Sequence, residues 1–225
     1  VTALGVYEAC LNGHRISDYV LAPGWTTYHK RLQYQVYDIT EEISNVNRLD
    51  ITVGKGWYRG DISGRMLDEQ KSWPCGLLAQ IKLTYTDGSV DIVVTDHSWL
   101  AEESKIRYSE IYHGEVYDAS YQTVDTIPCV EFDGPWNTLI PQEGEKIIEQ
   151  EHFVPAGIIT TPNGERVIDF GQNITGYVQI HLTANEGDTV TLSHGETLDY
   201  DGNFYNANYR AAKAKLCYIC RNGEQ

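Results

Sequence analysis

The segment LLAQIKLTYTDGSVDIVVT, residues 77–95, carries the clearest structural signal in this 225-residue chain. Apolar and polar side chains alternate on both sides of Asp87-Gly88, as they do in a β-strand with one buried face. An Asp-Gly pair between two such runs predicts a hairpin, because the tight turn needs residues that tolerate positive φ. We therefore expect an antiparallel hairpin here.

The same period of two recurs along the chain. LGVYEACL ends at Asn12-Gly13, which is a second hairpin signal. Residues 177–194 predict a third hairpin, with YVQIHLT and TVTLSH on either side of the turn ANEGD. Further strands are expected at 32–39, 48–54 and 214–220, and the helix candidates are short, such as DITEEIS after Asp38 as N-cap. The sequence therefore predicts an all-β architecture of antiparallel β-sandwiches.

A break in this pattern divides the chain. Residues 126–150 alternate poorly and carry prolines at 128, 135 and 141, as a connecting segment does. We expect a first domain over residues 1–127, a connecting strap over 128–147, and a second sandwich that begins at 148 and is incomplete at 225. An unfinished sandwich leaves strand edges uncovered, so residues 151–225 should lean on the first domain or self-associate.

The charge of the chain limits its partners. Its formal net charge is −15, and binding to nucleic acid needs a cationic face, so nucleic acid is excluded as a partner. Anionic membranes are disfavoured for the same reason, and no apolar run approaches the roughly 20 residues of a membrane helix. A neutral polar ligand such as a sugar remains compatible with this charge.

Five cysteines at scattered positions do not form a disulfide framework. Cys217 and Cys220 make a C-x-x-C, but they lie inside the alternating run KLCYIC and have no second pair or nearby His pair. Buried strand thiols are favoured over a zinc or redox site. Reduced thiols predict a cytoplasmic protein.

A glycine-rich loop, GKGWYRGDISGRM at residues 54–66, combines aromatic and cationic side chains. Aromatic rings bind the C–H face of a sugar, and charged groups bind its hydroxyls. Trp57, Tyr58 and Arg59 are therefore candidate carbohydrate-binding residues. The alternative is that Trp57 packs in the core and Arg59 pairs with a carboxylate.

A second candidate lies in RYSEIYHGEVYDAS, residues 107–120, where acidic side chains alternate with tyrosines. Tyr112, Glu115 and Asp118 are the candidate sugar-binding residues of this segment. Two carboxylates could also hydrolyse a glycoside or bind a cation, provided that they face one another. Acidic loops are more often solvated or structural, so we assign no catalytic residue.

Two further polar motifs indicate turns rather than sites. In RVIDFGQNITGYVQIHL, residues 166–182, the sequon at Asn173 is expected to be unused, and Asp169 can brace a turn between Gly171 and Gly176. DYDGN at 199–203 has its Gly too early for an EF-hand loop, so an acidic β-turn is favoured. We assign no metal ligand.

Several long motifs resemble one known family. The segments are VYEACLNGHRISDYVLAPGWTTYHKRLQYQVYDIT, VGKGWYRG, TDHSWLAEESKIRYSEIYHGEVYDAS and RVIDFGQNITGYVQIHL…GDTVTLSHGETLDYDGNFY. In this order they resemble the N-terminal accessory domain of bacterial α-L-rhamnosidases, followed by the start of the next sandwich domain. The resemblance implies a jelly-roll, galactose-binding-like first domain and a packed, non-catalytic corner at residues 169–176.

The family's chemistry lies elsewhere in its members. Their two catalytic carboxylates belong to a later (α/α)6 barrel that inverts the anomeric centre, so the resemblance implies an accessory fragment that is inactive alone. Its implied partners are rhamnose-containing glycosides and that barrel, and some relatives bind rhamnose with calcium. A stand-alone carbohydrate-binding module and a structural domain without ligand are the alternative functions.

Overall fold

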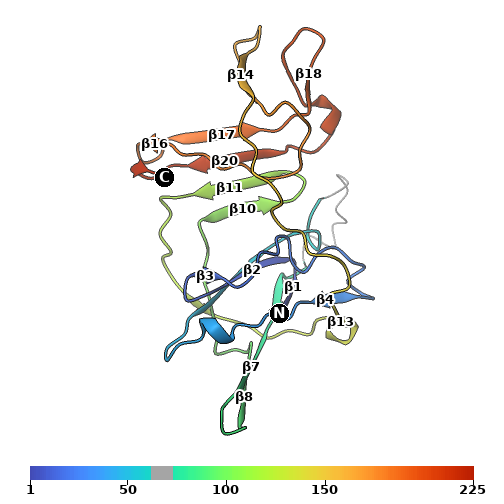
Figure 1. Cartoon of the computed structure of the whole chain (residues 1–225), viewed down its shortest axis with the longest axis vertical. Coiled ribbons are helices and arrows are strands. Elements are labelled where there is room, and N and C mark those ends of the chain that lie inside the picture. Colours follow the sequence, from blue (N-terminus) through green and yellow to red (C-terminus); the bar gives the residue numbers. More distant parts are fainter. Residues whose placement is uncertain (62–72) are drawn as a thin grey trace. The chain divides into compact units, whose positions relative to one another are not determined.

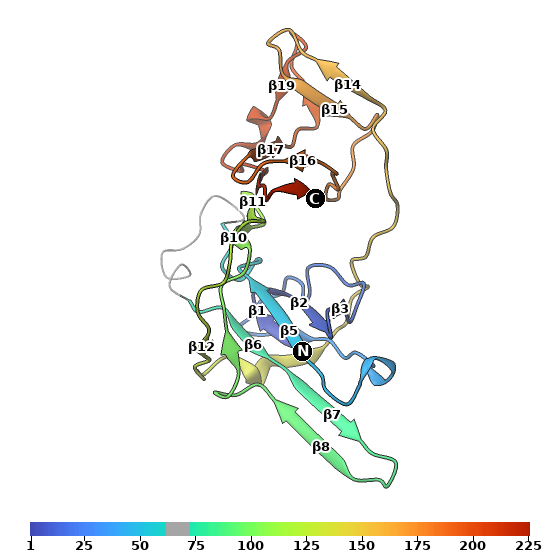
Figure 2. The same cartoon turned by 90° about the vertical axis from the view of Figure 1, so that its left-hand side faces the viewer.

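β-Strands form nearly all regular structure in the computed structural model, which describes residues 1–61 and 73–225. Within these residues the helices are three 3₁₀ turns of three residues each, and none is long or apolar enough to cross a membrane. The expected all-β class is therefore confirmed (Figures 1 and 2).

The described residues separate into two compact units. Unit 1 comprises Val1–Ser104, Ser109–Ile111 and Tyr121–Ile148, and unit 2 comprises Lys105–Tyr108, Tyr112–Ser120 and Glu149–Gln225. Unit 2 thus takes in residues 105–108 and 112–120, which precede the predicted strap. The domain limits at 127 and 148 stay a prediction.

Unit 1 is built from short strands and two of the 3₁₀ turns. These are β1 (Thr2–Leu4), β2 (Val6–Leu11), β3 (His14–Arg15), β4 (Leu32–Tyr34), η1 (Thr40–Glu42), β5 (Leu49–Gly54), β6 (Gly76–Leu78), β7 (Gln80–Thr84), β8 (Val90–Val94), β9 (Leu100–Ala101), β12 (Ile127–Pro128), η2 (Trp136–Thr138) and β13 (Leu139–Pro141). β2 pairs with β3 and β5, β1 with β6, β7 with β8, β9 with β12, and β4 in parallel with β13. The expected strand over 32–39 is therefore limited to three residues.

Two of the predicted hairpins form where the turn residues place them. Asn12 (φ 53°) and Gly13 (φ 84°) join β2 to β3, and both adopt the left-handed backbone that the turn requires. Gly88 (φ 87°) ends the turn between β7 and β8. These hairpins are confirmed, because their signals lie within the turn itself.

The core of unit 1 is small and rich in tyrosine. Buried side chains from β1, β2 and the loop that follows β3 form it: Ala3, Tyr7, Ala9, Tyr19 and Ala22. The Tyr7 hydroxyl meets Gln35 Oε1 at 2.7 Å and Tyr37 Oη at 2.8 Å, which satisfies its polar atom inside the core. Burial raises the pKa of Tyr7 far above its usual value, so this phenol stays neutral.

Unit 2 carries a four-stranded sheet in the order β10-β11-β20-β17. Its elements are β10 (Ile106–Glu110, shared with unit 1), β11 (Gly114–Asp118), β14 (Gly157–Thr160), β15 (Arg166–Asp169), β16 (Thr183–Ala184), β17 (Thr189–Ser193), β18 (Thr197–Leu198), β19 (Phe204–Tyr205), η3 (Ala207–Tyr209), β20 (Lys215–Ile219) and β21 (Gly223–Glu224). β11 and β20 run parallel, so antiparallel pairing holds for most pairs but not all.

The hairpin predicted over residues 177–194 is wrong. β17 forms as expected, but it pairs antiparallel with β20 over five residues, and β16 pairs with β21. The turn between β16 and β17 does form, since Asp188 N–H donates to Asn185 O at 3.2 Å. Alternation identifies a strand without naming its partner, and residues 177–182 form no strand beside β17.

Candidate functional site

The loop after β5 presents the first group of predicted site residues. It is described as far as Asp61, and residues 62–66 of the predicted loop lie outside the described residues. Arg59 N–H donates to Lys55 O at 3.2 Å and closes a turn. Gly56 has φ 52°, and a Cβ there would lie 2.6 Å from the Val6 side chain, so this turn requires glycine.

A buried carboxylate braces the far end of this loop. Glu110 is 5% exposed, and its Oε1 accepts the Asp61 N–H at 2.8 Å. A Cβ on Gly60 would lie 2.8 Å from the same oxygen, so the loop approaches Glu110 more closely than any other residue would allow. The position of the preceding aromatic side chains therefore depends on Glu110.

The loop's aromatic side chains join three others in an aromatic cluster, defined by Trp25, Tyr28, Trp57, Tyr58 and Trp73. Trp57 lies parallel to Trp25, with ring centroids 6.3 Å apart and planes at 3°. Tyr58 contacts Tyr28 edge-on at 5.3 Å and Trp73 at 5.3 Å. Trp25 is 61% exposed, so the cluster presents an indole at the surface of unit 1. Trp57 is half-buried.

The cluster offers ring faces and neutral hydroxyls. Burial raises the pKa of Tyr28 and of Tyr58, so both phenols keep their protons at physiological pH. Arg59 lies beside them, with Nη1 4.0 Å from Cys75 Sγ. Such a surface suits a ligand with an apolar C–H face and uncharged hydroxyls, since aromatic side chains bind through their faces.

The second group of predicted residues belongs to unit 2. Glu115 and Asp118 lie on β11, and Tyr112 lies in the turn before it, with its ring 5.5 Å from that of His113. Residues three apart on a strand point to opposite faces, so these two carboxylates do not face one another. Burial raises the pKa of Glu115, whereas Asp118 Oδ1 accepts the Ser120 N–H at 2.9 Å. The pair therefore lacks the geometry of an acid/base couple.

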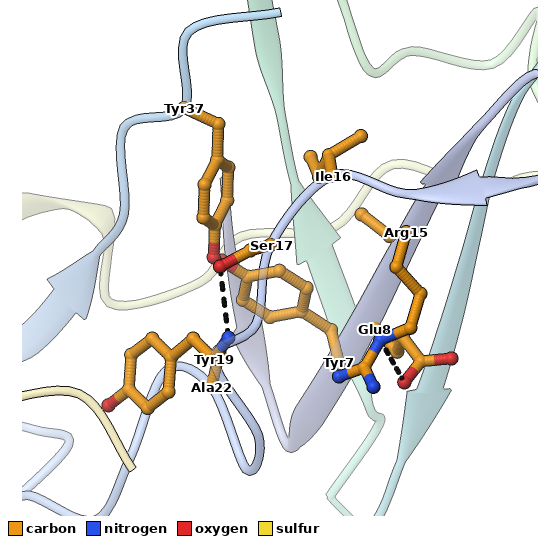
Figure 3. A pocket seen from close by; sticks show the side chains of 9 residues that line it. Tyr7, Glu8, Arg15, Ile16, Ser17, Tyr19, Ala22 and Tyr37 are labelled. Atoms are coloured by element: carbon orange, nitrogen blue, oxygen red, sulfur yellow. Dashed lines mark hydrogen bonds and ion pairs between the residues drawn. The ribbon is translucent and has the colours of Figure 1, made fainter. Parts of the chain in front are cut away.

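A cavity lined by Tyr7, Arg15 and Tyr37 is too small to be the site. Figure 3 shows the ion pair between Arg15 Nε and Glu8 Oε2, which is 3.0 Å long, and the hydroxyls of Tyr7 and Tyr37 close to one another at the other end of the Tyr7 ring. The cavity holds about 10 Å³, which is the space of one water molecule. It cannot admit a sugar.

In the part of the chain that the structure describes, the acidic groups do not gather as calcium ligands. Among residues 1–61 and 73–225, no three His, Cys, Asp or Glu side chains gather as metal ligands. Asp199 Oδ1 instead accepts the N–H groups of Asp201 at 3.0 Å and Asn203 at 2.8 Å, which makes DYDGN an acidic turn. All five cysteines are free thiols, and Cys220 is buried. The residues described do not fit a calcium ion.

The polar centre of RVIDFGQNITGYVQIHL is a turn, as predicted. Asp169 Oδ1 accepts the Gly171 N–H at 2.8 Å, and Gly171 has φ 72°. Residues 171–176 are exposed, so the turn is not packed within this chain. Its expected role in seating neighbouring domains stays a prediction.

Sequence reasoning missed Trp25, and it considered Glu110 as one of the acidic groups of residues 107–120 but not as the brace of the loop. Trp25 follows Pro23-Gly24, a turn signal that places an aromatic side chain on a loop. Glu110 lies 49 residues after Asp61, and no local pattern links them. Trp25 could have been recognised from its turn, whereas Glu110 could not.

Comparison with known proteins identifies the family of this chain. The family model described as "Alpha-L-rhamnosidase N-terminal domain" matches residues 1–151, and the model described as "Bacterial alpha-L-rhamnosidase concanavalin-like domain" matches residues 159–225. The chain belongs to the family of α-L-rhamnosidase N-terminal domains. It corresponds to the N-terminal portion of α-L-rhamnosidases, as the long motifs predict.

The relatives are much longer than this chain. An α-L-rhamnosidase of Streptomyces avermitilis is 36% identical to this chain over its whole length, and the match covers 23% of that enzyme. An α-L-rhamnosidase of an Alteromonas species is 34% identical over 94% of this chain, and the match covers 24% of that enzyme. The crystal structure of native α-L-rhamnosidase from Aspergillus terreus matches the whole chain with a TM-score of 0.87 at 30% identity. The Streptomyces avermitilis enzyme complexed with L-rhamnose matches with 0.85 at 31%. The chain covers 27% and 23% of these two structures and spans about a quarter of its relatives' length.

Proposed function

We propose that this chain is the accessory, non-catalytic portion of an enzyme that removes terminal α-L-rhamnose from glycosides, and that unit 1 binds sugar through the aromatic cluster. The observation that carries the sugar-binding role is the exposed Trp25 indole lying parallel to Trp57. Family membership and the L-rhamnose complex of a relative support the substrate class.

The catalytic step is assigned to another part of the parent enzyme. Glu115 and Asp118 point to opposite faces of β11, so they cannot protonate a leaving group and activate water on one sugar. The chain's second proposed role is to brace the catalytic barrel. Rhamnose-containing glycosides and that barrel are thus its proposed partners, and a cytoplasmic location stays a prediction.

Calorimetric titration of this chain with L-rhamnose, first with calcium and then with chelator, tests the sugar-binding role. A nitrophenyl rhamnoside assay runs beside it. We expect saturable heat without turnover, unchanged by the chelator. Turnover by the chain alone would overturn the non-catalytic assignment. Binding heat that disappears with chelator would show that the sugar binds at a calcium-dependent site and not at the aromatic cluster.

A variant pair locates the site. Trp25→Ala should weaken binding at least about tenfold, because an aromatic anchor contributes about 2 kcal/mol or more. Tyr200→Ala is the matched control, since it removes a fully exposed aromatic side chain from unit 2. Equal affinities of the two variants would contradict the proposed site, and no heat with any variant would leave a scaffold without ligand.

A further inference from the structure

The β7–β8 hairpin exposes an apolar strand. All five residues of β8 are exposed, although four of them are Val or Ile: Val90 46%, Ile92 57%, Val93 45% and Val94 46%. Figure 2 shows the hairpin extending away from the other strands of unit 1. A two-stranded hairpin is marginally stable in water, and an exposed apolar strand indicates a surface that is covered by a partner.

The backbone hydrogen bonds show which groups β8 leaves open. Thr95 N–H donates to Ala79 O at 3.0 Å, so Thr95 directs its backbone groups toward β7. These groups alternate in direction along an antiparallel strand. Val90, Ile92 and Val94 therefore direct their N–H and C=O groups away from β7.

A side chain confirms this direction. Trp99 Nε1 donates to Val94 O at 3.0 Å, which it could not do if that carbonyl pointed into the ladder. Within residues 1–61 and 73–225, β7 is the one strand that pairs with β8. Apart from the Trp99 indole at Val94 O, the outer edge of β8 thus has no partner strand among these residues, and apolar edges of this kind pair with other strands.

We propose that this edge pairs with β8 of a second copy of the chain. In an antiparallel pairing about Ile92, Ile92 lies opposite Ile92 of the partner subunit, and Val90 lies opposite Val94 of the partner subunit. The outward residues 90, 92 and 94 are symmetric about position 92. Every outward N–H on β8 therefore meets an outward C=O, and the pairing closes as a two-fold dimer. Val94 O, which already accepts the Trp99 indole N–H, would accept the bond from the partner subunit through its second lone pair.

The side chains distinguish a second copy from other strand partners. Asp91, the one charged residue of β8, lies opposite Val93 of the partner subunit in this register and does not face its own copy. The outer edge of β7 is different, because pairing about its centre would place Lys82 opposite Lys82 of the partner subunit. Like charges directly opposite are destabilising. Self-complementarity therefore belongs to β8.

The charge distribution sets the salt dependence of this dimer. The chain carries −15, whereas residues 77–95 hold only Lys82, Asp87 and Asp91. Repulsion between two copies thus comes from the rest of the chain, and salt screens it. The dimer should tighten as salt rises.

Light scattering on the full 225-residue chain tests the proposal. Over about 1 μM to about 1 mM of chain, the range suited to a small interface, the mass should rise from 25.4 kDa toward twice that value. Hydrogen exchange should slow at the amides of Val90, Ile92 and Val94 over the same range. A constant mass of 25.4 kDa would overturn the proposal, and so would growth beyond the dimer.

Two substitutions with equal charge locate the contact. Ile92→Lys places like charges opposite one another at the axis and should weaken the dimer at least about tenfold. Thr84→Lys adds the same charge on β7, where Thr84 is exposed, and should leave the dimer intact. Equal effects of the two would refute pairing through β8.

A backbone variant keeps the test valid if Ile92→Lys disturbs folding. The Ile92 N–H takes no part in the β7 ladder, so Ile92→Pro should preserve the hairpin and remove the central donor of the proposed pairing. Circular dichroism checks the fold of each variant. A folded Ile92→Pro variant that dimerises like the parent chain would overturn the proposal.

Discussion

Gly60→Ala should destabilise unit 1 and displace the aromatic loop. The new methyl group would lie 2.8 Å from Glu110 Oε1 and closer still to the backbone oxygen of Gly56, and ordinary contact begins at 3.4 Å. The loop must therefore move away from Glu110 by about 0.6 Å and from the Gly56 carbonyl by more. That movement stretches the 2.8 Å bond from Asp61 N–H to Glu110 Oε1 beyond its useful range. Overpacking costs about 1–3 kcal/mol and a lost bond to a charged group about 1–3 kcal/mol, so we expect a loss of about 2–6 kcal/mol.

Urea unfolding followed by tryptophan fluorescence measures this loss, because Trp57 lies in the same loop. The control is Gly157→Ala on β14, where a Cβ meets no atom within 4 Å and φ is not positive. This control should be neutral or stabilise by about 0.4–1 kcal/mol. If Gly60→Ala proves as stable as Gly157→Ala and binds sugar equally well, then the close approach of Gly60 to Gly56 and Glu110 does not position the loop.

The remaining predictions concern the tyrosine core and the acidic turn. Tyr7→Phe should cost about 1–3 kcal/mol near neutral pH, because it leaves the buried oxygens of Gln35 and Tyr37 without their partner. The pKa of folded Tyr7 is raised above its usual 10.0, so its contribution to stability is complete below pH 10 and is lost as pH rises. In urea unfolding at each pH, the stability of the parent chain should therefore fall above pH 10, and the stability of Tyr7→Phe should fall less steeply. A parallel fall in both proteins would assign the alkaline loss to other groups. Asp199→Ala should cost about 1 kcal/mol and speed hydrogen exchange at the Asn203 amide, whose acceptor it removes; unchanged exchange would show that the turn holds without the carboxylate.

Local turn chemistry explains why parts of the fold were predictable. Asn12-Gly13 and Asp87-Gly88 fix hairpins within a few residues, so β2–β3 and β7–β8 follow from the sequence. The segment 177–194 shows the limit of this reasoning. Its turn forms, yet β17 pairs with β20, because alternation indicates which face of a strand is buried and does not specify the partner strand.

The candidate site divides in the same way. GKGWYRG identifies a loop with aromatic and cationic side chains, and the structure describes Trp57, Tyr58 and Arg59 on that loop. Their surroundings come from distant segments: Trp25 supplies the exposed indole, and Glu110 supplies the brace. Conversely, the acidic segment 107–120 keeps its strand, but strand geometry separates its two carboxylates.

The sequence by itself determined the all-β class, the turn-defined hairpins and, through long motifs, the family. These properties depend on alternation and turn residues, which act over a few positions. Only the tertiary structure decided the partner of β17, the meeting of Trp25 with Trp57, and the open edge of β8. Each of these depends on which distant segments bury one another's surface. The local sequence of a strand or loop does not specify which distant segment will pack against it.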